Sequence, residues 1–176
     1  EGFKAIKAGH SEIEYIKLKP NMERAAAFLE TRRYAAYLGA TTEFNKMEGV
    51  AFNKEDKKLY IAMSYIEKGM LKDERFSKDD IRVAKNRCGG TYELALSGGI
   101  RDRDGEMIKS DFVPTSMHVP TALLGEEIAT DLFGNTCAVN KIANTDNLFY
   151  SSRARTLFIG EDSGAHVNNY VWAYNI

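Results

Sequence analysis

The chain has 176 residues and a mass of 19.7 kDa, which is the usual size of one domain or of a piece of a larger protein. Apolar residues make up 44% of it and charged residues 28%, so the chain can bury a core and does not belong to the disordered class. The 24 basic and 25 acidic residues leave a formal charge of -1, which gives no general attraction to nucleic acid or to an anionic membrane. No apolar run approaches the roughly 20 residues that a membrane-crossing helix needs.

The first part of the chain predicts a strand followed by one substantial helix. Residues 10–19 read HSEIEYIKLK, which favours an extended strand that Pro20 ends. Residues 22–38 read MERAAAFLETRRYAAYL and predict a helix of about four to five turns. Asn21 is a suitable N-cap for this helix, and Gly39 stands where a C-terminal cap is expected.

Short strands and turns are predicted from residue 47 onward. Residues 47–65 predict a β-hairpin, because two β-prone runs flank the turn NKEDKK. The charged residues 67–85 predict a loop with a helical turn, and residues 91–96 predict a strand between paired glycines. Residues 112–128 carry two of the three prolines and predict a long connection.

The tail, residues 146–175, has the clearest pattern. It predicts three antiparallel strands over residues 147–150, 156–161 and 169–174. Three such strands form a meander, which is most of a propeller blade.

An internal repeat relates the two hairpins at a constant offset of 98 residues. MEGVAFNKEDKKLYIAMSY aligns without gaps on TDNLFYSSRARTLFIGEDS, so that Val50 meets Leu148 and Ile61 meets Ile159. A blade has about 40 to 50 residues, so this offset leaves room for another blade or for insertions. The pattern predicts a mainly β fold, a partial β-propeller with one substantial helix. The alternative is that any two hairpins with a two-residue alternation align this well.

Four acidic residues lie at the ends of these strands. Glu48 and Asp146 precede the first strand of each hairpin, and Glu161 and Asp162 end the second strand of the later one. The first strand of a blade lines the central channel, where carboxylates repel one another unless a cation lies between them. Oxygen ligands of this kind predict a calcium site. The alternative for each acid alone is a side chain that faces water.

The cysteines and histidines give weaker signals. Cys88 and Cys137 lack the C-x-x-C spacing of a zinc site, and we interpret both as small apolar residues of the interior. His10, His118 and His166 are scattered without partners at ligand spacing, so we expect surface or loop positions.

Two long stretches resemble the PhoX-type alkaline phosphatases. They are ERAAAFLETRRYAAYLGATTEFNKMEGVAFN and NTDNLFYSSRARTLFIGEDSGAHVNNYVWAYNI, and the likeness spans most of residues 19–176. The resemblance implies an exported β-propeller that hydrolyses phosphate monoesters with an iron and calcium cluster in its channel. It implies metal-binding roles for Glu48 and Glu161, and weaker ones for Asp146 and Asp162, while it identifies no catalytic residue.

The family's enzymes are several times longer than this chain. The resemblance therefore implies that residues 1–176 are one segment of a larger periplasmic or secreted phosphatase. By the same resemblance the iron-ligating cysteine lies upstream of Glu1, so Cys88 does not take that role. The expected partner is a small phosphate ester, with neither nucleic acid nor membrane. Exposed blade edges predict self-association.

Two other functions remain open at this stage. One is a calcium-dependent propeller hydrolase that acts on lactones or related esters. The other is a non-catalytic propeller fragment that binds calcium or nothing.

Overall fold

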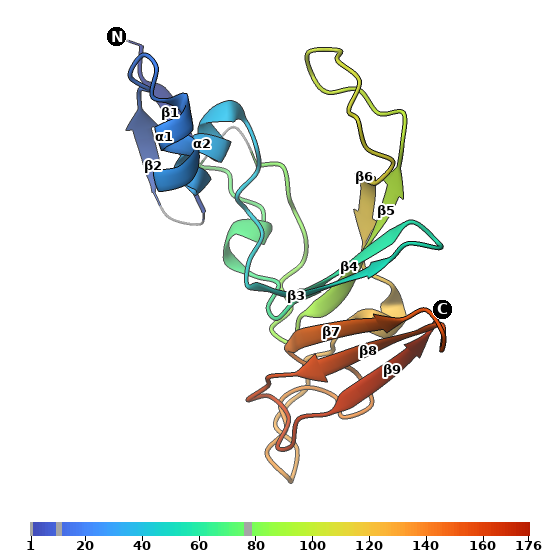
Figure 1. The fold of residues 1–176 in the computed structure, drawn as a ribbon. Coiled ribbons are helices and arrows are strands. Elements are labelled where there is room, and N and C mark those ends of the chain that lie inside the picture. The colour runs from blue at the N-terminus through green and yellow to red at the C-terminus, as the bar shows by residue number, and fades with distance from the viewer. Residues whose placement is uncertain (1, 10–11, 76–78) are drawn as a thin grey trace. The chain divides into compact units, whose positions relative to one another are not determined.

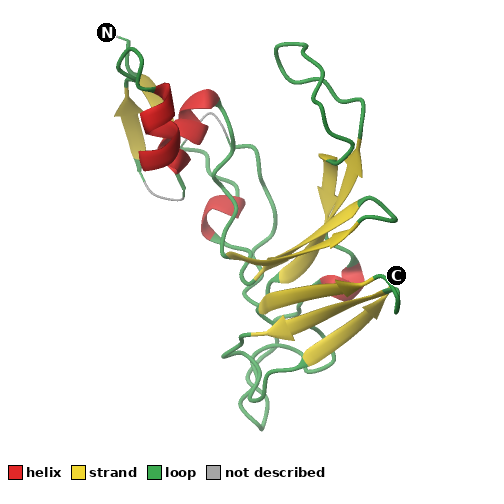
Figure 2. Cartoon of the chain, in the orientation of Figure 1, coloured by secondary structure: helices red, strands yellow, loops and turns green. Residues whose placement is uncertain are grey.

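The computed structural model describes residues 2–9, 12–75 and 79–176. The chain is mainly β, with three antiparallel sheets and two short α-helices, as Figure 1 and Figure 2 show. It divides into two compact units, of which the first comprises Glu1–Asn45 and Glu67–Lys85 and the second Lys46–Ile66 and Asn86–Ile176. The described residues do not close a propeller ring. No described helix has the length and apolarity to cross a membrane.

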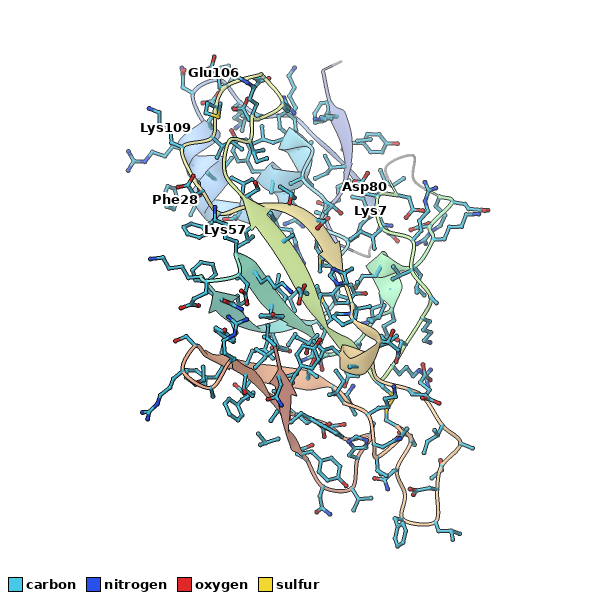
Figure 3. The ribbon with its side chains drawn as sticks, turned by 90° about the vertical axis from the view of Figure 1, so that its right-hand side faces the viewer. Lys7, Phe28, Lys57, Asp80, Glu106 and Lys109 are labelled. Carbon is cyan, nitrogen blue, oxygen red and sulfur yellow. A yellow bond between two sulfur atoms is a disulfide. The ribbon has the colours of Figure 1, made fainter. Side chains whose placement is uncertain are left out.

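The first unit combines a small sheet with two helices. Strand β1 (Lys4–Lys7) pairs antiparallel with β2 (Ile13–Ile16), and helices α1 (Glu23–Leu29) and α2 (Thr31–Leu38) follow. Helix α2 packs against β1 around a small core formed by Ile6, Ala8 and Ala36. Figure 3 labels Phe28 on α1, a ring that is 77% exposed.

The single helix predicted over residues 22–38 is wrong, because the helix breaks at Glu30. The backbone of Glu30 has φ -133° and ψ 40°, outside the helical region. The hydroxyl of Thr31 donates a hydrogen bond to the carbonyl of Ala27 at 2.6 Å, which competes with the backbone ladder at that turn.

The ends of the helices differ in how well the sequence predicts them. Gly39 caps α2 in the left-handed conformation with φ 101°, as predicted. The N-cap of α1 is Met22 and not Asn21, and no side chain caps that end. In the charged segment, the short 3-10 helix η1 (Lys68–Met70) is the predicted helical turn.

The second unit contains a four-stranded antiparallel sheet. Its strands are β3 (Met47–Asn53), β4 (Lys58–Met63), β5 (Gly90–Ser97) and β6 (Val113–His118), which follow one another in chain order. The sequence predicts a long connection over residues 112–128, and this is wrong in part, because Val113–His118 forms strand β6. Pro114 is tolerated there because β6 is the last strand of the sheet. The 3-10 helix η2 (Thr121–Leu123) follows it.

A three-stranded antiparallel sheet completes the second unit. It contains β7 (Thr145–Ser151), β8 (Thr156–Glu161) and β9 (Val171–Asn175), in the positions that the sequence predicts. Strands β3 and β7 lie side by side, so that the two sheets pack on each other (Figure 1). Their shared core is the buried cluster Ala51, Tyr60, Leu123, Ile142, Leu157 and Ile159.

The 98-residue repeat holds in the backbone of both hairpins. Met47 pairs with Met63 as Thr145 pairs with Glu161, and in each hairpin a bulge follows within three residues. Lys57 and Arg155, also 98 positions apart, both have positive φ, at 49° and 50°. Two hairpins that matched only in alternation would not share a bulge and a turn conformation. No further sheet lies between these two in the described chain, so insertions fill the spacing.

Cys88 and Cys137 form a disulfide, which corrects their interpretation as unpaired apolar residues. Their Cα atoms are 6.0 Å apart, and they stand 49 positions apart in the sequence. Both are buried, and they pack with Ala143. The disulfide therefore anchors the long loop before β7 to the residues that lead into β5.

Candidate functional site

Glu48 and Asp146 lie on the adjoining strands β3 and β7, at equivalent positions of the repeat. Gly49 shows how closely these strands approach. A Cβ atom built on Gly49 would lie 2.2 Å from the carbonyl oxygen of Asp146 and 2.8 Å from the backbone nitrogen of Leu148. Only glycine permits such an approach of two backbones. These two acids therefore come from neighbouring strands.

The ammonium group of Lys46 lies beside Glu48. It forms an ion pair with Glu48, whose side chain is 26% exposed. The hydrogen bond to Glu48 raises the pKa of Lys46, and the negative charge of Asp146 adds to that effect. The place between the two strands therefore attracts positive charge.

The donor chemistry of this place suits a hard divalent cation. Glu48 and Asp146 offer carboxylate oxygens, which calcium prefers as ligands. Calcium takes about six to eight oxygen ligands, so these two side chains supply part of a shell. Lys46 competes with such a cation, because its ammonium group already neutralises Glu48.

Glu161 is in a different environment. Its side chain is fully buried at the end of β8. One carboxylate oxygen, Oε1, accepts hydrogen bonds from the backbone N–H of Ala143 at 2.9 Å and the indole N–H of Trp172 at 2.7 Å. The other, Oε2, lies 2.9 Å from Nδ1 of His166 and accepts from the backbone N–H of Tyr170 at 3.1 Å.

These four contacts fill the acceptor positions of the Glu161 carboxylate. A metal ion could bind there only by displacing a hydrogen-bond donor, so Glu161 does not fit a metal role as it stands. His166 lies in the loop after β8, within the expected surface or loop positions, but it is buried beside Glu161 and has that carboxylate as a partner. His118 is exposed in β6 as expected, and His10 lies outside the described residues.

Asp162 is exposed, and its backbone N–H donates to the carbonyl of Asn144 at 3.1 Å. Within residues 2–9, 12–75 and 79–176, no three His, Cys, Asp or Glu side chains gather as a metal site requires. The four predicted acids therefore do not form one cluster. Glu48 and Asp146 lie on adjoining strands, whereas Glu161 belongs to a buried hydrogen-bond network.

Sequence reasoning missed Lys46 and Asn144, which precede β3 and β7 at equivalent positions. Both have positive φ, at 51° and 43°. The buried amide of Asn144 donates to the carbonyls of Ser64 and Arg87, and its oxygen accepts from the hydroxyl of Ser163 at 2.6 Å. The signal that could have found them is the repeat itself, extended by one residue toward the N-terminus.

No protein-family model matches the chain, and searches of the curated proteins and of the solved structures found no match. A function is therefore proposed from the chain's own residues, motifs and geometry.

Proposed function

We propose that the chain is part of a metal-dependent alkaline phosphatase that hydrolyses phosphate monoesters. The resemblance of its two long motifs to PhoX-type enzymes supports this reaction class. Two adjoining sheets that repeat each other support a propeller origin. The disulfide between Cys88 and Cys137 supports a periplasmic or secreted location, because disulfides persist in oxidising compartments.

The observation that carries the proposal is the position of Glu48 and Asp146. They occupy the same place in two repeats whose first strands lie side by side, and the ammonium of Lys46 pairs with Glu48 there. Further repeats of a propeller would add an equivalent residue each, so acidic ligands would surround one axis.

The role of these side chains is to hold a cation. A divalent ion bound there supplies polarisation of the phosphoryl oxygens and stabilises the charge that develops in the transition state. Glu48 and Asp146 bind through carboxylate oxygens and do not attack phosphorus. Metal roles for Glu161 and Asp162 rest on the resemblance alone, and Glu161 would have to release a hydrogen-bond partner to take one. Iron stays an expectation for the larger enzyme.

Calcium binding and ester hydrolysis test this proposal together. Calcium is titrated into the chain by calorimetry, and release of phosphate from a simple aryl phosphate is followed with and without the metal. We expect Glu48→Gln and Asp146→Asn each to weaken calcium binding at least tenfold, by about 1.4 kcal/mol or more. Asp104→Asn is the matched control, because that carboxylate is exposed in a loop of the second unit and is not one of the four predicted acids.

The rival functions give different results in the same assays. A calcium-dependent lactonase would hydrolyse a lactone and leave the aryl phosphate intact. A binding scaffold would take up calcium without turnover of either ester, in this chain and in any longer protein that contains it. Unchanged calcium affinity in both acid variants would remove the metal site from the proposal.

A further inference from the structure

The side chain of Asn144 connects the two repeats next to their acidic residues. Asn144 immediately precedes β7 and is 2% exposed. Its amide nitrogen, Nδ2, donates to the carbonyl of Ser64 at 2.9 Å and to the carbonyl of Arg87 at 2.8 Å. Its oxygen, Oδ1, accepts from the hydroxyl of Ser163 at 2.6 Å. Both amide donors and the amide oxygen therefore have partners.

The repeat shows what Ser64 contributes to this connection. Ser64 and Asp162 are equivalent, because they lie 98 positions apart and each directly follows the second strand of its hairpin. The N–H of Ser64 donates to the carbonyl of Lys46 at 3.0 Å. The equivalent bond of the second repeat runs from the N–H of Asp162 to the carbonyl of Asn144, at 3.1 Å. Each repeat thus closes its own hairpin, and the amide of Asn144 adds a bond from the second repeat to the closing residue of the first.

These bonds form one path from the start of β3 to the start of β7, two strands that lie side by side (Figure 1). The path runs from the carbonyl of Lys46 through the backbone of Ser64 to the amide of Asn144. Glu48 lies two residues after the first of these positions, and Asp146 lies two residues after the last. The path therefore fixes the backbone that carries one acid relative to the backbone that carries the other.

The segment that receives Asn144 is itself anchored. The carbonyl of Cys88 accepts the backbone N–H of Asn144 at 2.8 Å, next to the carbonyl of Arg87 that accepts the amide. The disulfide joins Cys88 to Cys137. A covalent bond as well as hydrogen bonds therefore holds this end of the connection.

The backbone of Asn144 explains why asparagine suits the position. Its φ is 43°, in the left-handed region that asparagine and aspartate enter more readily than most other residues with a side chain. Aspartate has no N–H group to donate to the two carbonyls. In the first repeat the equivalent residue is Lys46, whose side chain pairs with Glu48 instead. The connection therefore comes from the second repeat.

We propose that Asn144 is the positioning residue that sets the separation of Glu48 and Asp146, and through it the affinity of their cation site. The inference rests on the proposed function, in which these two carboxylates hold a divalent ion. Asn144 does not touch the ion. It holds the two strands that carry the ligands, as outer hydrogen bonds hold metal ligands in general. A pair of ligands that is already in place binds more tightly, because binding does not have to order it.

Calcium titration of two variants separates positioning from general stability. Asn144→Gly removes the connection and keeps the backbone conformation, because glycine readily adopts a positive φ. This variant should bind calcium about tenfold more weakly, which is a usual size for such an indirect effect. Thr156→Val is the matched control, since its hydroxyl also donates to a carbonyl, that of Ala154 at 2.8 Å, but at the opposite end of β8 from Glu161. Its calcium affinity should stay within about twofold of the unchanged protein.

Spin labels measure the separation of the two strands without any metal. Met47→Cys and Asn147→Cys introduce labelling sites at exposed positions, each next to one of the acids, while the native cysteines stay paired in the disulfide. We expect dipolar broadening between the two nitroxides in the otherwise unchanged protein and in the Thr156→Val variant. The broadening should be clearly weaker in the Asn144→Gly variant, because its strands are no longer held at one separation.

The two measurements distinguish the possible failures. Equal broadening with and without Asn144→Gly overturns the positioning role, whatever the titration gives. Weaker broadening with unchanged calcium affinity also overturns it, provided that Glu48→Gln and Asp146→Asn weaken binding. If those two acid variants leave calcium binding unaltered, the proposed function fails instead. Weaker broadening in the Asn144→Gly variant then still supports Asn144 as the residue that sets the separation of the two acids.

Discussion

Oε2 of Glu161 lies 2.9 Å from Nδ1 of His166, and both side chains are fully buried. The second nitrogen of the same ring, Nε2, is 3.3 Å from the carbonyl of Ala138. The carboxylate thus connects β8 to the loop before β7, while the histidine connects the loop after β8 to the same region. This network fixes the end of the second hairpin, in contrast to the more open pair of Glu48 and Lys46.

Glu161→Gln is expected to destabilise the fold strongly. A side-chain amide offers two donors and one acceptor oxygen in place of two acceptor oxygens, so at least one N–H group that now donates to the carboxylate would face the amide N–H groups. Breaking a buried polar network of this kind costs about 3 kcal/mol. Urea unfolding followed by the fluorescence of Trp172, the only tryptophan, measures the change.

Glu48→Gln is the matched control for that measurement. Its side chain is partly exposed and its partner Lys46 is more exposed still, so the substitution should leave the free energy of unfolding within about 0.5 kcal/mol of the unchanged protein. Equal losses for Glu48→Gln and Glu161→Gln would contradict the contrast between the two sites.

Removing the disulfide should lower stability without changing the fold. The bond joins Cys88 to Cys137 across a sequence separation of 49, for which loop-closure entropy gives about 4 kcal/mol. We expect the free energy of unfolding of the Cys88→Ser and Cys137→Ser double variant to be lower by that amount. The double variant should therefore unfold at a lower urea concentration than the unchanged protein. Reductant should shift the unchanged protein toward the double variant and leave the double variant itself unaffected. Insensitivity of the unchanged protein to reductant would contradict the pairing.

The stability of the second unit should fall at alkaline pH. Burial, and then the negative charge of Glu93, raise the pKa of Tyr60 well above its ordinary 10.0, and burial raises the pKa of Tyr92. The unfolded chain loses these phenolic protons near pH 10.0 while the folded chain keeps them. The stabilisation is therefore complete below that pH and declines as the pH rises toward the pKa values of the folded state.

Tyr60→Phe separates this effect from general alkaline denaturation. The variant has no phenol to ionise at that position, so its free energy of unfolding should decline less steeply above about pH 10. Urea unfolding at a series of pH values gives both slopes. Parallel slopes for Tyr60→Phe and the unchanged protein would show that Tyr60 is not the group responsible.

Lys46 should weaken calcium binding if Glu48 and Asp146 hold the ion. Its raised pKa keeps the ammonium group charged at neutral pH, where it repels a divalent cation. Lys46→Gln is expected to tighten calcium binding about tenfold, a gain of about 1.4 kcal/mol. Lys54→Gln, an exposed position in the turn after β3, is the control in the same calorimetric titration. No change in affinity would place the calcium elsewhere.

The sequence predicts the hairpins well because their information is local. The alternation around Phe52 and Leu59, and around Tyr150 and Leu157, specifies which face of each strand is apolar, and the repeat adds the equivalence of the two. The break at Glu30 escapes this reasoning, since the apolar periodicity continues through it and the side-chain hydrogen bond of the neighbouring Thr31 leaves no mark on that pattern.

The remaining features depend on contacts between distant residues. Pro114 suggests a connection, and only the position of β6 at the end of the sheet makes a strand acceptable there. The pairing of Cys88 with Cys137 has no spacing signal. Glu48 and Glu161 look alike in sequence, because the donors that surround Glu161 come from loops whose course no local pattern specifies.

Gly49 provides the most direct test of the contact between the two sheets, on which the candidate site depends. Gly49→Ala would place a methyl group 2.2 Å from the backbone oxygen of Asp146, so β3 and β7 must move apart. The expected loss is about 2 kcal/mol, as in other overpacked interiors.

Gly160→Ala in β8 is the control, since its methyl group meets Asn147 at an ordinary 3.6 Å. That change should leave stability unaltered or raise it by up to about 1 kcal/mol. The same unfolding midpoint for both variants would show that β3 and β7 do not approach as described.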